Sequence, residues 1–204
     1  ASGVGKTTLI KILMGLVQAD DGKVIGINNK KISVVFQEDS LCENLSVLLN
    51  IKLVCENISN LEIEKSLELL DLKDCMHKRV RELSGGMKRR IAIIRALLYD
   101  FDLLIMDEPF KGLDKETKIK VMDFVISKLE NKSAIIITHD MDEMLSMLQK
   151  RLLRELKKQY PEYIDGDYLI FAMKDVFSST KHPFVILIDE WDCVFREFKQ
   201  DTNA

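Results

Sequence analysis

The feature that most constrains this chain is its opening run, Gly3-Val-Gly-Lys-Thr-Thr8. Glycines let the backbone curl so that several N–H groups point at one anion, and a following helix N-terminus adds a positive dipole end. In such a loop Lys6 reaches the β- and γ-phosphates of a nucleotide, and the Thr7 hydroxyl is a ligand for Mg²⁺. The run therefore predicts a nucleotide site rather than a plain glycine turn before a helix.

Apolar residues at helical spacing follow this run, which predicts an amphipathic helix from Thr7 to Val17. Its expected inward stripe is Leu9, Ile12, Leu13 and Leu16.

Length and composition fit a globular chain. The 204 residues are 47% hydrophobic and 31% charged, enough for one sizeable core or for one domain and part of another. The net charge of −3 gives no electrostatic reason to expect a nucleic-acid partner. No apolar run approaches the roughly 20 residues of a membrane helix. The four cysteines show no C-x-x-C spacing and no histidine lies beside one at zinc spacing, so no structural metal is expected.

Strand-like and helix-like segments alternate along the chain. Apolar runs at 32–36, 103–106 and 134–137 predict strands, the last two of a kind buried in a parallel sheet. Residues from about 40 to 98 have helical character and predict a small helical subdomain, with Ser59 and Glu62 as a capping box. The alternation predicts an α/β fold with a mainly parallel sheet flanked by helices.

Two of the predicted helices carry apolar stripes that are expected to face inward. After Leu83 the stripe is Met87, Ile91, Ile94 and Leu98, and after Gly112 it is Ile119, Met122, Ile126 and Leu129.

Polar side chains follow each predicted strand. Gln37 follows the first, Asp107 and Glu108 the second, and His139 the third. Because ligands bind at the carboxyl ends of strands in parallel sheets, we expect these side chains to meet at one edge. Asp107 is placed to hold Mg²⁺, which prefers hard oxygen ligands, and Glu108 to polarise a water against the terminal phosphate.

Six motifs, in the family's order along the chain, resemble those of the nucleotide-binding subunit of an ATP-binding-cassette (ABC) transporter, a P-loop NTPase. The opening run resembles the family's Walker A motif, Leu103–Glu108 its Walker B motif with the catalytic glutamate, and Gln37 its Q-loop glutamine. The remaining three are Leu83-Ser-Gly-Gly-Met87, similar to the signature motif, Gly112-Leu-Asp114, similar to the D-loop, and Thr138-His-Asp140, similar to the switch-histidine motif.

The resemblance implies a composite site for ATP and Mg²⁺. The residues implied to hold the nucleotide within one chain are Ser2, Gly3, Val4, Gly5, Lys6, Thr7 and Thr8. Ser84, Gly85 and Gly86 would bind the γ-phosphate of a nucleotide held by a second copy, so a head-to-tail dimer is implied.

The remaining motif residues carry implied catalytic and coupling roles. Glu108, His139 and Lys6 form the implied catalytic set, and Thr7, Gln37 and Asp107 the implied metal set. Gln37 would also sense a transmembrane partner, and Asp114 would communicate across the dimer.

The resemblance also implies an assembly. Permease subunits and a solute-binding protein are the expected partners, without nucleic acid, and the expected location is cytoplasmic, on the inner face of the membrane. The patterns at 36–40, 83–87 and 107–114 look most like importers of the nitrate, sulfonate and taurine group.

The chain departs from the family pattern at two places. Met87 stands where the signature motif more usually has glutamine. The first strand, the first glycine of the phosphate loop and the adenine-stacking aromatic are expected upstream of Ala1. Residues 1–146 are therefore interpreted as an ABC ATPase domain without its first strand, with residues 40–98 as the helical subdomain.

The C-terminal segment follows a different pattern. A single helix is predicted over 141–159, a second over 167–178, and a strand over 183–188 that ends in Asp-Glu-Trp-Asp. The segment from 183 to 195 resembles a predicted AAA-ATPase-like family, so residues 147–204 are interpreted as a C-terminal α/β extension. An apolar strand ending in solvated acids is the alternative, and no catalytic role is assigned to Asp189 or Glu190.

Two functions are consistent with these patterns. The first is ATP binding and hydrolysis as the subunit of an ABC importer. The second is a truncated or composite nucleotide-binding or interaction module without turnover.

Overall fold

The computed structural model describes residues 6–27, 29–55, 57–130, 132–138, 141–164, 167–168, 172 and 179. The chain divides into two compact units, residues 1–147 and 148–204. The elements, in chain order, are α1 (Lys6–Leu13), β1 (Ile32–Val35), α2 (Val47–Lys52), α3 (Asn60–Leu69), the 3-10 turns η1 (Lys73–Cys75) and η2 (Val80–Glu82), α4 (Gly85–Leu98), β2 (Leu103–Asp107), α5 (Lys115–Lys128), β3 (Ser133–Ile137) and α6 (Met141–Gln159).

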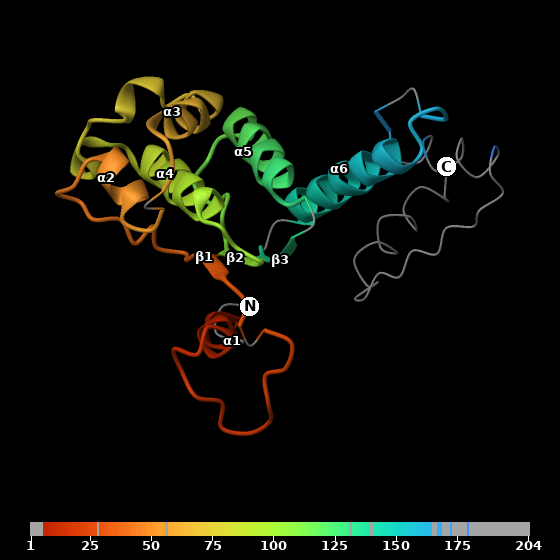
Figure 1. Cartoon of the computed structure of the whole chain (residues 1–204), viewed down its shortest axis with the longest axis horizontal. Coiled ribbons are helices and arrows are strands. Elements are labelled where there is room, and N and C mark those ends of the chain that lie inside the picture. The colour runs from red at the N-terminus through yellow and green to blue at the C-terminus, as the bar shows by residue number, and fades with distance from the viewer. Residues whose placement is uncertain are drawn as a thin grey trace, which may run out of the picture. The chain divides into compact units, whose positions relative to one another are not determined.

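A three-stranded parallel sheet in the order β1-β2-β3 forms the centre of the first unit (Figure 1). Val35 pairs with Met106 at the end of the first ladder, and Asp107 pairs with Ile137 at the end of the second. All three predicted strands are confirmed to within a residue or two. Their carboxyl ends lie at the same edge of the sheet.

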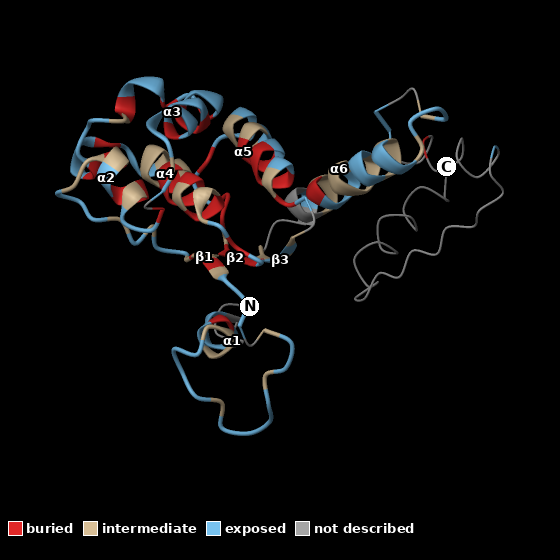
Figure 2. Ribbon diagram, in the orientation of Figure 1, coloured by how far each residue is buried: buried red, intermediate tan, exposed pale blue. Residues whose placement is uncertain are grey.

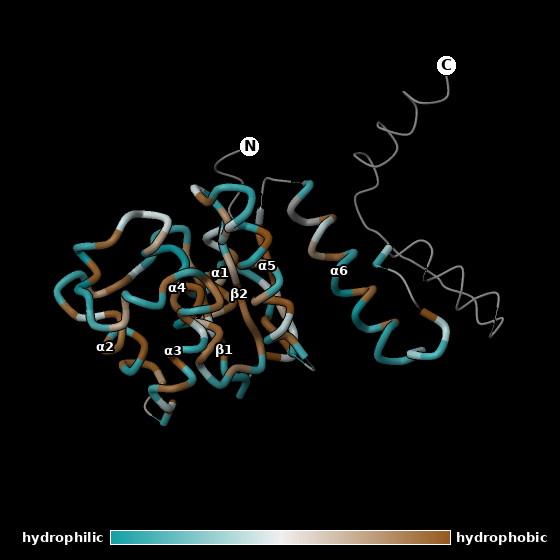
Figure 3. Tube along the Cα trace, turned by 90° about the horizontal axis from the view of Figure 1, so that it is seen from above, coloured by the Kyte–Doolittle hydropathy of each residue, from teal (hydrophilic) through white to brown (hydrophobic). Residues whose placement is uncertain are grey.

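Both faces of the sheet are covered, as the α/β prediction requires. Leu103 and Ile105 of β2 pack with Ile10 of α1 on one face. Leu104 and Met106 point the other way, into the larger core formed with α2, α3, α4 and α5. Figure 1 shows α1 on one side of the strands and these four helices on the other, and Figure 3 shows the hydrophobic residues running along β1 and β2. Successive strand side chains alternate between faces, so a fully apolar strand serves two cores.

The helical subdomain lies between β1 and β2 in sequence. Ser59 caps α3 by accepting a 3.1 Å hydrogen bond from the Glu62 N–H, which is the serine half of the predicted capping box. Ile63 and Leu67 of this helix are fully buried. Asn50 is buried as well, and its side chain bonds the backbone of Cys42, Leu45 and Ser46. These contacts hold the loop that connects the sheet to the subdomain.

The first helix differs from its prediction. It ends at Leu13, four residues before Val17, because Gly15 takes a left-handed φ of 71°. The Gly15 N–H donates to Ile12 and the Leu16 N–H to Lys11, which is the hydrogen-bond pattern of a Schellman cap. The predicted stripe is only partly correct, because Leu13 packs against the core whereas Leu9 and Leu16 are exposed.

Burial shows which face of α1 turns inward. Ile10 is 1% exposed, whereas Leu9 and Leu16 of the predicted stripe are 55% and 62% exposed. Figure 2 shows α1 with only a short buried segment among exposed and intermediate ones. Among the described residues, the face of α1 that meets a partner surface is the one toward β2.

Two further expectations of burial are wrong. Residue Ile119, predicted to face inward, is 43% exposed, while Val121, Phe124 and Val125 of α5 join the core. Strand β3 was predicted to be buried, yet Ser133 is exposed and Ile135 is 38% exposed. Within the described residues β3 pairs on one side only, with β2, and lies at the edge of the sheet.

The helix predicted over 141–159 is confirmed as α6, which begins in the first unit and continues into the second. No described helix is both long and apolar enough to cross a membrane. The strand and acidic run predicted at 183–192 lie outside the described residues, as does nearly all of the helix predicted over 167–178.

Candidate nucleotide site

The candidate site is built at the carboxyl edge of the sheet. Gln37 lies two residues beyond β1 and is exposed, Asp107 ends β2, and Thr138 follows β3. The register of the two ladders brings these three positions to one edge, as predicted from the strand pattern. His139, one residue further on, lies outside the described residues, as do Ser2, Gly3, Val4 and Gly5.

One hydrogen bond joins the phosphate-loop helix to this edge. Thr7 is in the first turn of α1, and its hydroxyl donates to Oδ2 of Asp107 at 2.9 Å. Asp107 is 3% exposed, so its carboxylate is held in a largely dry position. Lys6 begins the same helix, and Thr8 is exposed beside Thr7. Two hard oxygen donors therefore meet at the N-terminus of a helix, which is the chemistry that a nucleotide phosphate with a divalent cation requires.

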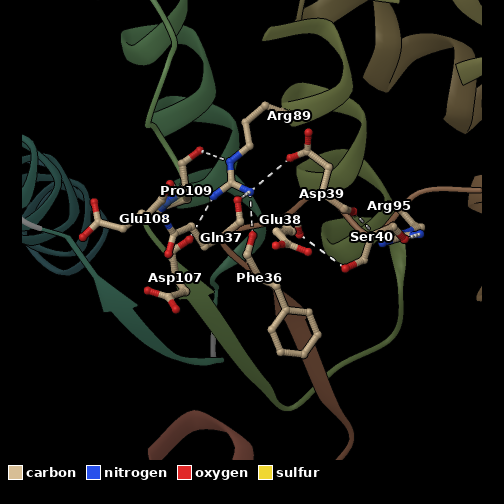
Figure 4. Close-up of polar contacts among 10 residues, drawn as sticks. All are labelled: Phe36, Gln37, Glu38, Asp39, Ser40, Arg89, Arg95, Asp107, Glu108 and Pro109. Atoms are coloured by element: carbon tan, nitrogen blue, oxygen red, sulfur yellow. Dashed lines mark hydrogen bonds and ion pairs between the residues drawn. The ribbon is translucent and has the colours of Figure 1, made fainter. Parts of the chain in front are cut away.

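Glu108 follows immediately and has an unusual backbone. Its φ of 48° lies in the left-handed region that non-glycine residues rarely adopt. Its N–H donates a 2.8 Å hydrogen bond to the Ile137 carbonyl, which extends the pairing of β2 with β3 by one residue. In Figure 4 its side chain points away from the guanidinium of Arg89. This turn directs the residue after a buried strand out of the sheet.

The signature-like segment forms the N-terminus of the 14-residue helix α4. Ser84 is the N-cap, and its hydroxyl accepts a 3.3 Å hydrogen bond from the Met87 N–H. Ser84 and Gly85 are exposed and Gly86 is half-buried. A side chain at Gly86 would come within 3.7 Å of Leu113 in the D-loop-like segment. The exposed helix N-terminus is accessible to an anion supplied by another molecule.

Asp114 caps the next helix, α5. Its carboxylate accepts hydrogen bonds from the Thr117 N–H at 3.0 Å and from the Thr117 hydroxyl at 2.7 Å. These hydrogen bonds hold the pKa of Asp114 below its usual value. Gly112, two residues earlier, has a φ of 79°, a conformation that glycine adopts without strain. Asp114 thus has a local structural role in addition to any role at an interface.

Arg89 is the residue at this site that the sequence patterns missed. It is 4% exposed, and its guanidinium donates hydrogen bonds to backbone carbonyls of both the Q-loop-like and the Walker B-like segments (Figure 4). A signal was present, because Arg89 is three, four and seven residues before Ala92, Ile93 and Ala96, all buried on α4. A charge on the buried stripe of a helix requires partners.

Residues 1–111 match the protein family described as ABC transporter. The taurine import ATP-binding protein of Jannaschia sp. (strain CCS1) is 36% identical, in a match that covers 94% of this chain and 80% of that protein. This chain belongs to the ABC transporter family. It carries the ATP-binding domain of that family, the domain of ABC-type ATPases.

Other relatives of this ABC domain agree. The molybdenum import ATP-binding protein of Haemophilus influenzae is 33% identical over 76% of this chain, and the spermidine/putrescine import ATP-binding protein of Treponema pallidum is 34% identical over 72%. The chain spans 49% and 43% of those two proteins, about half their length.

A solved structure agrees as well. It is described as the dimeric post-hydrolysis state of an ATP-binding cassette bound to ADP and Pi. It matches with a TM-score of 0.62 and 26% identity over 70% of this chain and 73% of that one.

Proposed function

We propose that this ABC domain binds ATP together with Mg²⁺ and hydrolyses it as the nucleotide-binding subunit of an importer. The observation that carries the proposal is the 2.9 Å hydrogen bond between the Thr7 hydroxyl and the Asp107 carboxylate. It brings the helix of the phosphate loop and the end of the Walker B-like strand to one point. Phosphate binding and phosphate chemistry need both segments there.

The donor set fits Mg²⁺. Thr7 and Asp107 offer hard oxygens, and the exposed amide of Gln37 follows the neighbouring strand. Among the described residues, no group of three or more histidine, cysteine or acidic side chains could hold a metal ion alone. When bound, Mg²⁺ would neutralise charge on the phosphates.

Within the chain, the proposed chemistry divides among a few residues. Lys6 stabilises charge on the β- and γ-phosphates, and Glu108 orients or deprotonates the attacking water. His139 would contact the γ-phosphate and hold that water in place. The left-handed backbone of Glu108 and its hydrogen bond to Ile137 support this role, because they fix the direction in which the carboxylate leaves the strand.

Dimer formation follows from the separation of the two phosphate-binding segments. The exposed N-terminus of α4, residues 84–86, would bind the γ-phosphate of a nucleotide on a second copy. Asp114 lies at the start of α5 and would meet that copy. Permease subunits and a solute-binding protein complete the assembly at the inner face of a membrane, with Gln37 sensing the permease. The similarity to the taurine import protein supports importer over exporter.

Replacement of Glu108 by glutamine tests the proposal. Glu108→Gln keeps the size of the side chain and removes its basicity, so ATP turnover is expected to fall by about 10²- to 10⁴-fold while the Kd for MgATP stays within a few-fold. Glu116→Gln is the matched control, because Glu116 is an exposed acid on α5 paired with Lys120. Unchanged turnover in Glu108→Gln would contradict the role of Glu108. ATP binding without turnover in the wild type would instead favour a nucleotide-binding module.

A further inference from the structure

The guanidinium of Arg89 makes a dense set of contacts for one buried side chain (Figure 4). An arginine has five N–H donors in a planar fork. Those of Arg89 are directed to the carbonyls of Phe36 (2.6 Å), Gln37 (3.4 Å), Asp107 (2.9 Å), Glu108 (2.6 Å) and Pro109 (2.9 Å), and to a carboxylate oxygen of Asp39 (3.1 Å). Each nitrogen has at least one acceptor, so the buried charge is satisfied.

These acceptors belong to two different loops. Residues 36–39 follow β1, and residues 107–109 lie at and beyond the end of β2. The backbone ladder between the two strands ends at Val35 and Met106. Beyond that pair, the two loops are connected by hydrogen bonds from Arg89, which belongs to a third element, α4. The Q-loop and the turn at Glu108 are therefore held to each other through one side chain.

The contacts are made where the backbone is strained. Glu108 has a φ of 48°, and its carbonyl is held by Nη2 of Arg89. Ser40 has a φ of 49°, and its carbonyl is held by Nη1 of Arg95, also from α4. Left-handed conformations of non-glycine residues persist only where the surroundings hold them. Helix α4 thus supports a strained turn in each loop, but Arg89 alone of these two arginines contacts both loops.

We propose that Arg89 is a positioning residue that couples the Q-loop, residues 37–40, to the catalytic turn at Glu108. A shift of the Q-loop pulls on Nη1 of the guanidinium, and because the fork is planar and rigid, the Nη2 contacts to the Asp107 and Glu108 carbonyls shift with it. The inference rests on the proposed function, since it gives Gln37 and Glu108 their roles. It extends that function by identifying how one reaches the other.

Hydrolysis kinetics provide the first arm of the test. Arg89→Lys keeps a positive charge but replaces the fork by a point charge, and Arg89→Gln removes the charge. Both are expected to lower single-turnover hydrolysis by about 10²-fold, the effect of misplacing a catalytic group by about 1 Å, with the Kd for MgATP within about three-fold of wild type. Lys88→Gln is the matched control, since Lys88 is the neighbouring residue on α4 and its ammonium pairs with Glu43 at 2.7 Å.

A double-mutant cycle separates coupling from simple loss of structure. Gln37→Ala is expected to lower hydrolysis in the wild-type background but to have little further effect once Arg89 is lysine or glutamine. A purely structural role would leave the effect of Gln37→Ala unchanged. Additive effects in a folded Arg89→Lys protein would therefore overturn the proposal.

Amide hydrogen exchange provides an arm that does not need turnover. In Arg89→Lys, peptides covering 36–40 and 107–112 are expected to lose protection together, with Lys88→Gln unchanged. Loss of protection in one peptide only would overturn the coupling. If the wild type binds ATP without hydrolysing it, the proposed function fails and the exchange data still decide the coupling. If Arg89→Gln fails to fold, Arg89→Lys is used for both the kinetic and the exchange measurements.

Discussion

The Thr7 hydroxyl and the Asp107 carboxylate are joined by a 2.9 Å hydrogen bond across 100 positions of sequence. The first residue is in the opening turn of α1, and the second is the last residue of a strand that is buried throughout. The packing of Ile10 against Leu103 and Ile105 sets the distance between them, because it places α1 on that face of the sheet. The hydrogen bond thus depends on an apolar contact a few residues away.

Removal of the Thr7 hydroxyl is expected to weaken binding only when Mg²⁺ is present. Thr7→Ala removes one proposed oxygen ligand of Mg²⁺ and should raise the Kd for MgATP by about 10-fold or more, which corresponds to about 1.4 kcal/mol or more. Titration calorimetry with Mg²⁺ and with EDTA checks this. Thr7→Ser keeps the hydroxyl and should bind as the wild type does. Equal affinity of Thr7→Ala and wild type in Mg²⁺ would argue against Thr7 as a ligand.

Two serine caps form a matched pair that separates stability from function. Ser59 caps α3 and Ser84 caps α4 in the same way. Alanine at either position should lower the free energy of unfolding by about 1 kcal/mol in urea titrations. Only Ser84→Ala should also lower ATP turnover, because only that helix N-terminus is proposed to meet a nucleotide. A similar fall in turnover for both variants would trace the effect to stability.

The Asp114 carboxylate is expected to make a pH-dependent contribution to the free energy of unfolding. Its hydrogen bonds from Thr117 lower its pKa in the folded chain. The stabilisation is therefore present above the unfolded pKa of about 3.9 and is lost as the pH falls through the lower folded value. Thermal unfolding of wild type and Asp114→Ala should differ at pH 6 and converge in strong acid. Asp114→Asn keeps an acceptor oxygen and should lack this pH dependence.

Cysteine reactivity provides a check on the core of the helical subdomain. Burial raises the pKa of the Cys55 thiol to about 11. Because the thiolate is the reactive form, Cys55 should alkylate slowly at pH 8, whereas Cys42 is exposed and should react quickly. Peptide mapping after iodoacetamide treatment measures both rates. Equal rates in the native protein would contradict this packing, and equal rates in denaturant are expected.

Local patterns predicted much of the fold. The three strands, the Ser59 cap and the extent of α6 were all expected from runs of a few residues. Such features depend on how regularly apolar side chains repeat along the sequence and on capping groups that lie within one helical turn. The meeting of Gln37 and Asp107 at one edge was also expected, because parallel strands bring their carboxyl ends together.

Burial was predicted less well. Leu9, Ile119 and Ile135 are apolar and fit a periodic pattern, yet each is exposed by more than a third. A hydrophobic pattern shows which faces could be buried. Whether a face is buried depends on a neighbouring surface that the pattern does not contain.

By itself, the sequence determined the family, the order of the motifs and the type of the main elements, since these are written in consecutive residues. Only the tertiary structure decided which residues of α1 and β3 are buried, and that Thr7 reaches Asp107. Only it shows the contacts of Arg89 as well. A buried charge is tolerated where carbonyls from distant segments converge on it, and such convergence exists only in the folded chain.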